Sequence, residues 1–406
     1  MGKILFEEMK KKDIDWIILS GERQKSTDIR YFLKDLTFAS PVILIKQNEE
    51  PIIIHNILES EEALQSKAKT ICRDEIVSRD EIRKLSSLKD QTEIFIKKCI
   101  EKFGISGKML LLGNQPFQKA FMIYEILKNI DNIKLADIND SEVMKRVREI
   151  KTQDEIEKIQ DVSTKVSGIY REIRNLLKDG IIKNSLLFDK SGKPIKLGDI
   201  RHLVEKIIAE QGLSGSEIPI ISMGEEAASP HMTGNVEMQV KEGSPIVIDI
   251  FPNDNKTGYF SDMTRTFCVG KTSDYVKTLY NHVKEAYEIG KKSVKLDYKT
   301  NITDIAVSDF FIQKGHKTSR DNAGTKEGYI HSLGHGVGLD VHESPSLSFI
   351  SNDIFKKMSV FTIEPGLYYK PKSAGIRLED TFYIDHNGNL KNLTSFPMKL
   401  SVDEDI

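Results

Sequence analysis

The stretch IVIDIFPNDNKTGYFSDMTRTF, residues 246–267, decides the fold of the C-terminal half of the chain. Its first five residues are apolar and β-branched apart from Asp249, which predicts a buried strand. Residues 253–258 favour a turn, and a second strand-like run follows them. In a hairpin centred on this turn, Asp249 and Asp262 face each other about 5 Å apart. Because two buried carboxylates repel unless a proton or a cation lies between them, the pattern predicts a metal ion.

A second acidic hairpin follows near the C-terminus. FTIEPGLYY (residues 361–369) carries Glu364 near the end of one predicted strand, and AGIRLEDTFYI (residues 374–384) carries Glu379 in the next. The turn-rich link 371–375 is not centred midway between the two glutamates, so the sequence leaves their register open. One acid on a hairpin is usually solvated, but two apolar hairpins that both carry acids predict one shared, buried site.

An imidazole stands between the two hairpins, with glycines on both sides. In HSLGHGVGLDVHESP (residues 331–345), these glycines allow the backbone beside His335 to approach a ligand or a metal closely. Three of the nine histidines of the chain lie within these residues. Four carboxylates and one imidazole suit two adjacent divalent cations, with manganese, cobalt, iron or zinc as candidates. Two such metals can activate water near neutral pH, so the sequence predicts a two-metal hydrolase.

Composition is that of an ordinary enzyme. The 406 residues include 59 Lys+Arg and 61 Asp+Glu, so the overall charge gives no case for nucleic acid or acidic membranes as partners. Cys72, Cys99 and Cys268 are few and widely spaced, which predicts reduced thiols and a cytoplasmic protein. No apolar run approaches the roughly 18 residues of a membrane span, and the N-terminus lacks the apolar core of a signal peptide.

Residues 1–142 predict a separate α/β domain. Four short apolar runs are typical of strands: residues 15–20, 41–46, 51–55 and 109–113. Residues 118–130 follow with helical apolar spacing.

Residues 143–406 predict a catalytic domain in which one order of elements occurs twice. Thr152 and Glu155 form a capping box that opens an amphipathic helix. The other predicted helices are residues 199–211, 273–296 and 302–313. Two helices therefore precede each acidic hairpin, and this repeated order predicts two related halves.

The hairpins, the histidine segment and their order resemble the pita-bread metallopeptidase family. The resemblance runs from about residue 150 to the C-terminus. DIRYF (residues 28–32) resembles an early motif of the creatinase-type N-terminal domain, which is found in the Xaa-Pro aminopeptidase and prolidase branch. The resemblance implies an α/β (α+β) protein: a creatinase-like α/β domain, then a pita-bread domain with a curved antiparallel sheet and outer helices. It also implies a homodimer.

The resemblance assigns a role to each candidate residue. Asp249 would bind one metal, Asp262 and Glu379 would bridge both, and His335 and Glu364 would complete the other. Four further residues match catalytic positions of the family. His231 matches a substrate-contacting histidine and His342 a histidine that steadies the tetrahedral intermediate, whereas His331 and Arg377 match positions typical of the proline-specific branch. Two divalent cations are implied, with Mn²⁺ expected first and Co²⁺, Zn²⁺ or Fe²⁺ as alternatives.

Three functions are compatible with these residues. The first is a peptidase that cuts the bond before proline in Xaa-Pro dipeptides or at the N-terminus of longer peptides, with Glu364 as general base. The second is a metal-dependent non-peptidase hydrolase or lyase on the same fold. The third is a non-catalytic binding module, but such relatives typically lose ligands, and this chain keeps all five. The 249–262 link is longer than is usual in the family, and we expect it to change the rim of the site rather than its ligands.

Overall fold

The computed structural model describes residues 2–34, 36–215 and 217–405. The chain divides into two compact units, Met1–Arg148 and Glu149–Ile406. This division falls a few residues after the predicted boundary, and the domain limits 1–142 and 143–406 stay a prediction. Across the described ranges, no helix has both the length and the apolar character needed to span a membrane.

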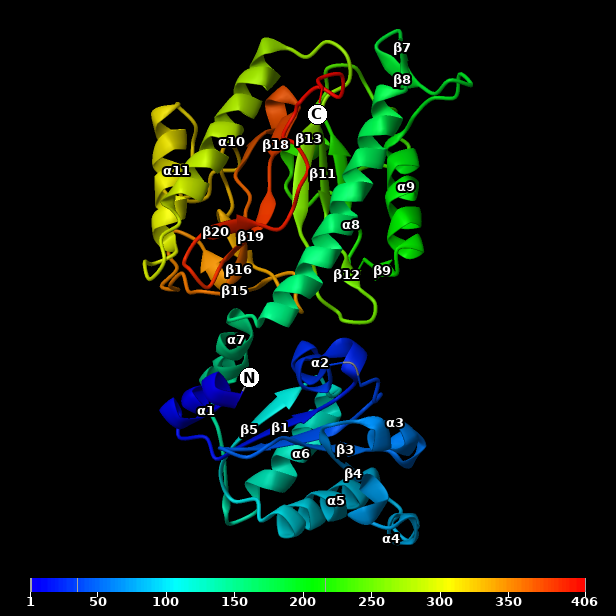
Figure 1. Cartoon of the computed structure of the whole chain (residues 1–406), viewed down its shortest axis with the longest axis vertical. Helices are drawn as coiled ribbons and strands as arrows, with labels where there is room; N and C mark the ends of the chain where they lie inside the picture. Colours follow the sequence, from blue (N-terminus) through cyan, green and yellow to red (C-terminus); the bar gives the residue numbers. More distant parts are fainter. Residues whose placement is uncertain (1, 35, 216, 406) are drawn as a thin grey trace. The chain divides into compact units, whose positions relative to one another are not determined.

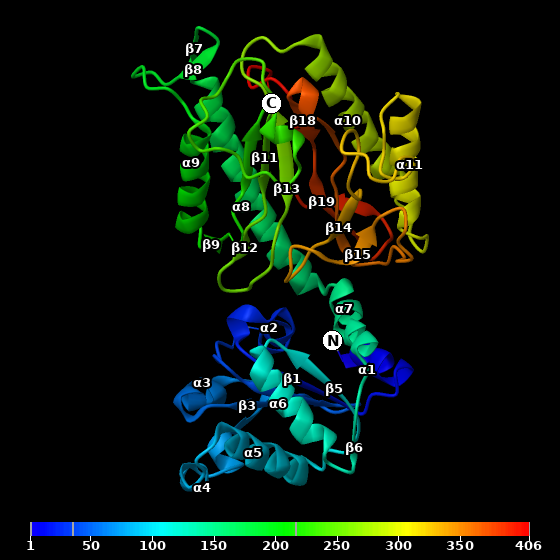
Figure 2. The ribbon, with the colours of Figure 1, turned by 180° about the vertical axis from the view of Figure 1, so that it is seen from behind.

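The N-terminal unit is an α/β layer structure around one mixed sheet with the strand order β4-β3-β2-β1-β5-β6. The strands are β1 (Trp16–Ser20), β2 (Val42–Lys46), β3 (Ile52–His55), β4 (Lys69–Cys72), β5 (Gly107–Gly113) and β6 (Ile133–Leu135). The helices are α1 (Gly2–Lys11), α2 (Thr27–Leu33), α3 (Ser60–Gln65), α4 (Arg79–Arg83), α5 (Leu88–Phe103), α6 (Phe117–Lys128) and α7 (Glu142–Glu149). The four predicted strands are β1, β2, β3 and β5. Figures 1 and 2 show α5 and α6 on one face of this sheet and α2 on the other.

The C-terminal unit repeats one arrangement of helices and strands, as the sequence predicts. Its helices are α8 (Gln153–Lys178), α9 (Leu197–Glu210), α10 (Asp274–Ser293) and α11 (Asn301–Gln313). The first half contains β7 (Ile181–Lys183), β8 (Leu186–Phe188), β9 (Leu213–Ser214), β10 (Ile220–Met223), β11 (Ile246–Ile250), β12 (Asn253–Asp254) and β13 (Met263–Phe267). The second contains β14 (Gly334–Gly336), β15 (Glu343–Leu347), β16 (Val360–Ile363), β17 (Gly366–Tyr369), β18 (Ala374–Arg377), β19 (Asp380–Ile384) and β20 (Leu390–Asn392).

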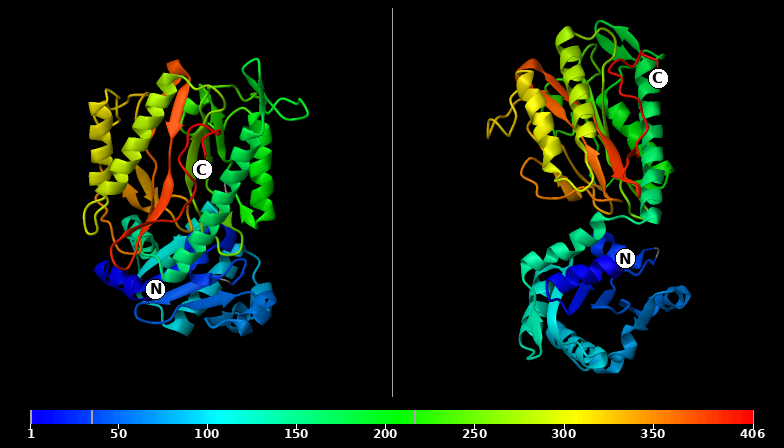
Figure 3. Two further views of the ribbon diagram at one scale, coloured as in Figure 1. Left: turned by 45° about the horizontal axis from the view of Figure 1, so that its top comes forward. Right: turned by 60° about the vertical axis from the view of Figure 1, so that its left-hand side comes forward.

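Each half has its own apolar core between helices and sheet. α8 and α9 pack on the sheet β10-β11-β13, and α10 and α11 pack on the strands β16 to β19. Figure 3 shows both helix pairs beside these strands. Ile248 and Ile250 of β11 belong to the first core. Because side chains alternate along a strand, Asp249 between them points to the opposite face.

The start of α8 is fixed by the predicted capping box. The Thr152 hydroxyl accepts a hydrogen bond from the backbone N–H of Glu155, and the Glu155 carboxylate accepts one from the backbone N–H of Thr152. This reciprocal pair satisfies two N–H groups that a helix terminus leaves without partners.

The first acidic hairpin is present, but its predicted register is wrong. Asp249 lies opposite Thr264, not opposite Asp262. The turn is centred one residue later than predicted, because the Asp254 carboxylate accepts two backbone N–H groups of the turn at 3.0 and 2.7 Å. Gly258, at φ +80°, then donates its N–H to the Asp254 carbonyl. Asp262 is thus diagonal to Asp249, two residues along from its partner and on the same face.

The structure determines the register of the second hairpin, which the sequence left open. β16 pairs with β19 and β17 with β18 in one continuous register, which places Glu364 opposite Glu379 at the step between the two ladders. At this step the backbone N–H of Glu379 donates to the Thr264 carbonyl of the first half at 3.0 Å. The Thr381 hydroxyl also donates to the Asp262 carbonyl at 2.7 Å. The two hairpins therefore meet at the four predicted acids.

Candidate metal centre

A cavity of about 280 Å³ lies where the two hairpins meet. Every residue that the sequence singled out lines it: Asp249, Asp262, His335, Glu364, Glu379, His231, His331, His342 and Arg377. The wall also includes Glu217, Ile218 and Phe251, which the sequence did not single out.

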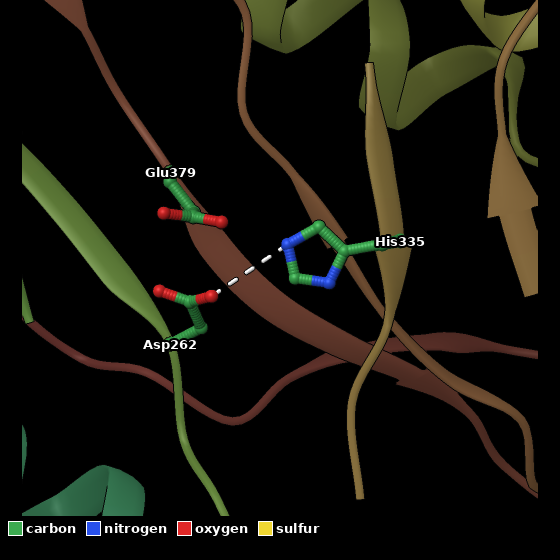
Figure 4. A group of neighbouring side chains, drawn as sticks. All are labelled: Asp262, His335 and Glu379. Carbon is green, nitrogen blue, oxygen red and sulfur yellow. Dashed lines mark ion pairs between the residues drawn. The ribbon is translucent and has the colours of Figure 1, made fainter. Parts of the chain in front are cut away.

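Asp262, His335 and Glu379 form the centre of this group. Their ligand atoms all lie within 4.8 Å of one another, and Figure 4 shows the three side chains pointing toward a common point. Nε2 of His335 lies 3.6 Å from Oδ2 of Asp262 and 3.3 Å from Oε1 of Glu364. The residues of the site therefore come from β14, from both hairpins and from the step between the β16–β19 and β17–β18 pairs.

The glycines beside His335 let the backbone of β14 lie close to its neighbouring strands. A Cβ on Gly334 would lie 2.1 Å from the carbonyl oxygen of Thr362, and a Cβ on Gly336 would lie 2.2 Å from that of Ser344. These glycines therefore let β14 approach its neighbouring strands, which places the imidazole against the acids of the second hairpin.

Three buried carboxylate oxygens in the cavity lack a hydrogen-bond partner among the described residues: Oδ1 of Asp249, Oδ1 of Asp262 and Oε1 of Glu379. The second oxygen is held in two of these groups. Oδ2 of Asp249 accepts from Arg377 at 2.5 Å, and Oε2 of Glu379 accepts from the Thr264 hydroxyl at 2.7 Å. A buried charge without a partner is costly, so oriented acids with free oxygens fit divalent cations.

The pKa values of these acids and of His335 also indicate a site for cations. Burial and the neighbouring carboxylates raise the pKa of Asp262 and of Glu379 well above their usual range. Burial opposes the charges on Glu364 and His335, but their ion pair outweighs it, so the pKa of Glu364 falls to about 2 and that of His335 rises to about 9. Without a cation, the chain must hold protons here to limit repulsion.

Arg377 connects several parts of the site. The guanidinium is buried, and it donates to Asp249 and to the Tyr368 hydroxyl, the latter at 3.0 Å. The Tyr368 hydroxyl in turn lies 2.9 Å from Nε2 of His331. The sequence did not single out Tyr368. Tyr368 lies two residues after Gly366, in the strand that follows Glu364. This position is the sequence signal that could have identified it.

His342 and His231 lie toward the opening of the cavity. His342 is exposed, but its ring packs edge-on against that of His335, with centroids 4.2 Å apart, and partial burial of the ring together with the neighbouring His335 charge lowers its pKa. The next residue, Glu343, forms a buried ion pair of 2.5 Å with Lys151, just before α8. His231 is exposed.

Comparison with known proteins identifies the family. The model of metallopeptidase family M24 matches residues 143–386. The Xaa-Pro dipeptidase of Pyrococcus furiosus is 30% identical over 290 residues, which cover 70% of this chain and 79% of that protein.

Solved structures share the fold over nearly the whole chain. The Xaa-Pro dipeptidase from Bacillus anthracis superposes with a TM-score of 0.76 at 23% identity and covers 98% of each chain. The N-terminal domain of the FACT complex subunit SPT16 from Cicer arietinum superposes with a TM-score of 0.73 at 15% identity, covering 97% of this chain and 95% of that one. The predicted pita-bread fold is confirmed. Because the fold is shared this widely, the function must be argued from the site.

Proposed function

The chain belongs to metallopeptidase family M24, and we propose that it hydrolyses the peptide bond before proline, in Xaa-Pro dipeptides or at the N-terminus of longer peptides. The observation that carries the proposal is the set of buried carboxylate oxygens that line the cavity and have no hydrogen-bond partner among the described residues. The Xaa-Pro preference is supported by the relative in Pyrococcus furiosus, whose name is Xaa-Pro dipeptidase.

Asp249, Asp262, His335, Glu364 and Glu379 are the proposed ligands of two divalent cations, with Mn²⁺ first and Co²⁺, Zn²⁺ or Fe²⁺ as alternatives. Cations bound there would supply activated water and a Lewis acid for the scissile carbonyl.

The chain itself provides the proton acceptor and the orientation of the acids. Glu364 is ionised at neutral pH and is the proposed general base. His335 must lose its proton to act as a ligand, and the pKa of Glu364 then rises because its ion pair is lost. Arg377 keeps Asp249 in place, and His342 and His231 line the cavity where a peptide carbonyl would lie.

A hydrolysis panel tests the proposal. The purified chain is loaded with manganese, cobalt or zinc and given Ala-Pro, Met-Pro, Xaa-Pro-Xaa tripeptides and Met-Ala-Ser. Cleavage of dipeptides alone identifies a dipeptidase, and cleavage of the tripeptides before proline identifies an aminopeptidase. If metal binds and every Xaa-Pro bond stays intact, the peptidase proposal fails in favour of a non-peptidase hydrolase or lyase.

The role of Glu364 has its own control. Glu364→Gln is expected to abolish turnover without unfolding the protein, whereas Glu225→Gln, at an exposed acid, is expected to leave turnover unchanged. Wild-type turnover in Glu364→Gln would refute the proposed base.

The homodimer and the cytoplasmic location stay predictions. Light scattering coupled to size exclusion, at several protein concentrations, gives the mass of the assembly directly.

A further inference from the structure

A second cavity, of about 470 Å³, lies within the N-terminal unit, and the proposed peptidase chemistry makes no use of it. Its floor is the sheet, with Ile18, Leu44 and Leu111, and its walls are α5 and α6, with Phe95 and Ile123. This volume is within the range of about 300–1,000 Å³ that is typical of small-molecule sites.

The cavity exists because the helices cover this face of the sheet incompletely. On the central strand β1, Ile17 and Leu19 point to the face that carries α2, and both are 0% exposed. Ile18 points to the other face and is only half-buried, although strands flank β1 on both sides. α5 and α6 therefore leave a gap above the middle of the sheet, and apolar side chains line it.

The cavity opens where ligands commonly bind in α/β proteins. β1 and β5 are parallel neighbours, and the chain leaves them in opposite directions, from β1 to β2 on one side and from β5 to β6 on the other. Crevices at the carboxyl ends of strands at such a switch point are the usual ligand sites of open α/β sheets. Ser20, Gly113 and Gln115, at these strand ends, line the cavity. The Asn114 side chain joins the two loops by accepting the backbone N–H of Glu22 at 3.1 Å.

The polar part of the wall carries uncompensated positive charge. Lys119 and Arg73 line the cavity, and neither has an acidic partner among the residues that the structure describes. The Arg73 guanidinium lies 4.5 Å from the centre of the Phe95 ring, which holds it against the wall. Glu22, the acid of the lining, is paired with Lys25 at 2.8 Å.

We propose that this cavity binds a small carboxylate with an apolar body, with its head at Lys119 and its chain between the sheet and α5–α6. The proposal is independent of the peptidase function, because every lining residue belongs to the N-terminal unit.

The single tryptophan of the chain makes the test direct. Trp16 lies in the same apolar cluster as the lining residues Phe95 and Leu127, and it is two residues before Ile18 on the same face of β1. Decanoate, titrated into the full chain below its micelle concentration, is expected to change Trp16 fluorescence saturably. Calorimetry repeats the titration independently of the fluorescence signal. Decanol is the matched neutral probe and is expected to bind more weakly.

Three variants separate head recognition from apolar filling. Lys119→Met is expected to weaken decanoate binding about tenfold, the effect of losing one charge-assisted hydrogen bond, and to leave decanol binding unchanged. Lys128→Met, at an exposed lysine of α6 outside the cavity, is expected to change neither. Ile123→Phe fills space in the cavity and is expected to weaken both ligands without lowering the melting temperature.

Three outcomes would overturn the proposal. The first is no saturable binding of decanoate by fluorescence and by calorimetry. The second is equal affinity for decanol and decanoate in the wild type. The third is the same loss of affinity in Lys119→Met and Lys128→Met.

Discussion

Replacement of Asp262 by asparagine is expected to abolish metal binding and yet to stabilise the metal-free protein. The ligand atoms of Asp262 and Glu379 lie within 4.8 Å of each other. At an effective dielectric constant of about 20, two unit charges at this separation repel by about 3.5 kcal/mol. Asparagine keeps the shape of the side chain and removes both this repulsion and the need to hold a proton that relieves it. We therefore expect the free energy of unfolding in EDTA at pH 8 to rise by up to about 3 kcal/mol.

The dependence on pH gives the sign of this effect. The pKa of Asp262 is raised in the folded protein, so the folded state holds a proton that the unfolded state releases above about pH 4. The metal-free wild type therefore loses stability as pH rises from about 4 toward the folded pKa. Asparagine does not titrate, so the advantage of the variant is near zero at about pH 4 and grows toward pH 8.

Urea denaturation followed by circular dichroism, with Trp16 fluorescence reporting the N-terminal unit separately, measures both effects. Wild type in manganese at 100 times its Kd should gain about 2.7 kcal/mol, and Asp262→Asn almost nothing. Asp179→Asn, at an exposed acid, serves as the control. The reasoning is refuted if the Asp262 variant is less stable than wild type in EDTA at pH 8.

Three further results are expected. Arg377→Met removes the buried partner of Asp249 and should lower the free energy of unfolding of the metal-free protein by about 3–5 kcal/mol. Urea denaturation should show a smaller loss when manganese is bound. Equal losses with and without manganese would contradict Asp249 as a ligand. Lys151→Met leaves the Glu343 charge buried and should lower the free energy of unfolding by a similar amount. In thermal melts, adding Glu343→Gln to this variant should partly restore the melting temperature. Since the pKa of His335 is about 9, metal binding at pH 7 should release protons, which calorimetry in buffers of different ionisation enthalpy detects.

The local elements of the fold could be predicted because their signals lie within a few residues. Thr152 and Glu155 open α8 as the capping box predicts, since both partners are three residues apart. The registers of the two hairpins were missed for different reasons. In the first, the signal is also local, because the side chain of Asp254 accepts the N–H groups of residues 256 and 257, but the prediction centred the turn without using this contact. In the second, a backbone bond from Glu379 to Thr264, in another sheet, fixes the strand at the step.

The same distinction between local and distant signals applies to the candidate site. Its acids and imidazole could be identified because each has a recognisable local sequence. The groups that hold them could not, because their partners are distant in the chain. Asp249 and Arg377 are 128 residues apart, and Lys151 and Glu343 are 192 residues apart. A buried cation can be recognised only when its partner is known. The resemblance therefore placed Arg377 among the catalytic positions, and nothing in the sequence indicated its contact with Asp249.

The balance of charge favours two cations over one. Asp249, Asp262, Glu364 and Glu379 carry four negative charges when ionised, and Arg377 offsets one of them. His335 contributes a positive charge only while it is protonated, and a metal ligand must be neutral. A single divalent ion would leave the buried group with one negative charge, which would repel the negative charge that develops on a carbonyl oxygen during hydrolysis. Two divalent ions leave one positive charge, which stabilises that oxygen. Burial and the same excess of negative charge raise the pKa of Asp262 and Glu379 in the metal-free cavity, where protons taken from solvent substitute for the cations.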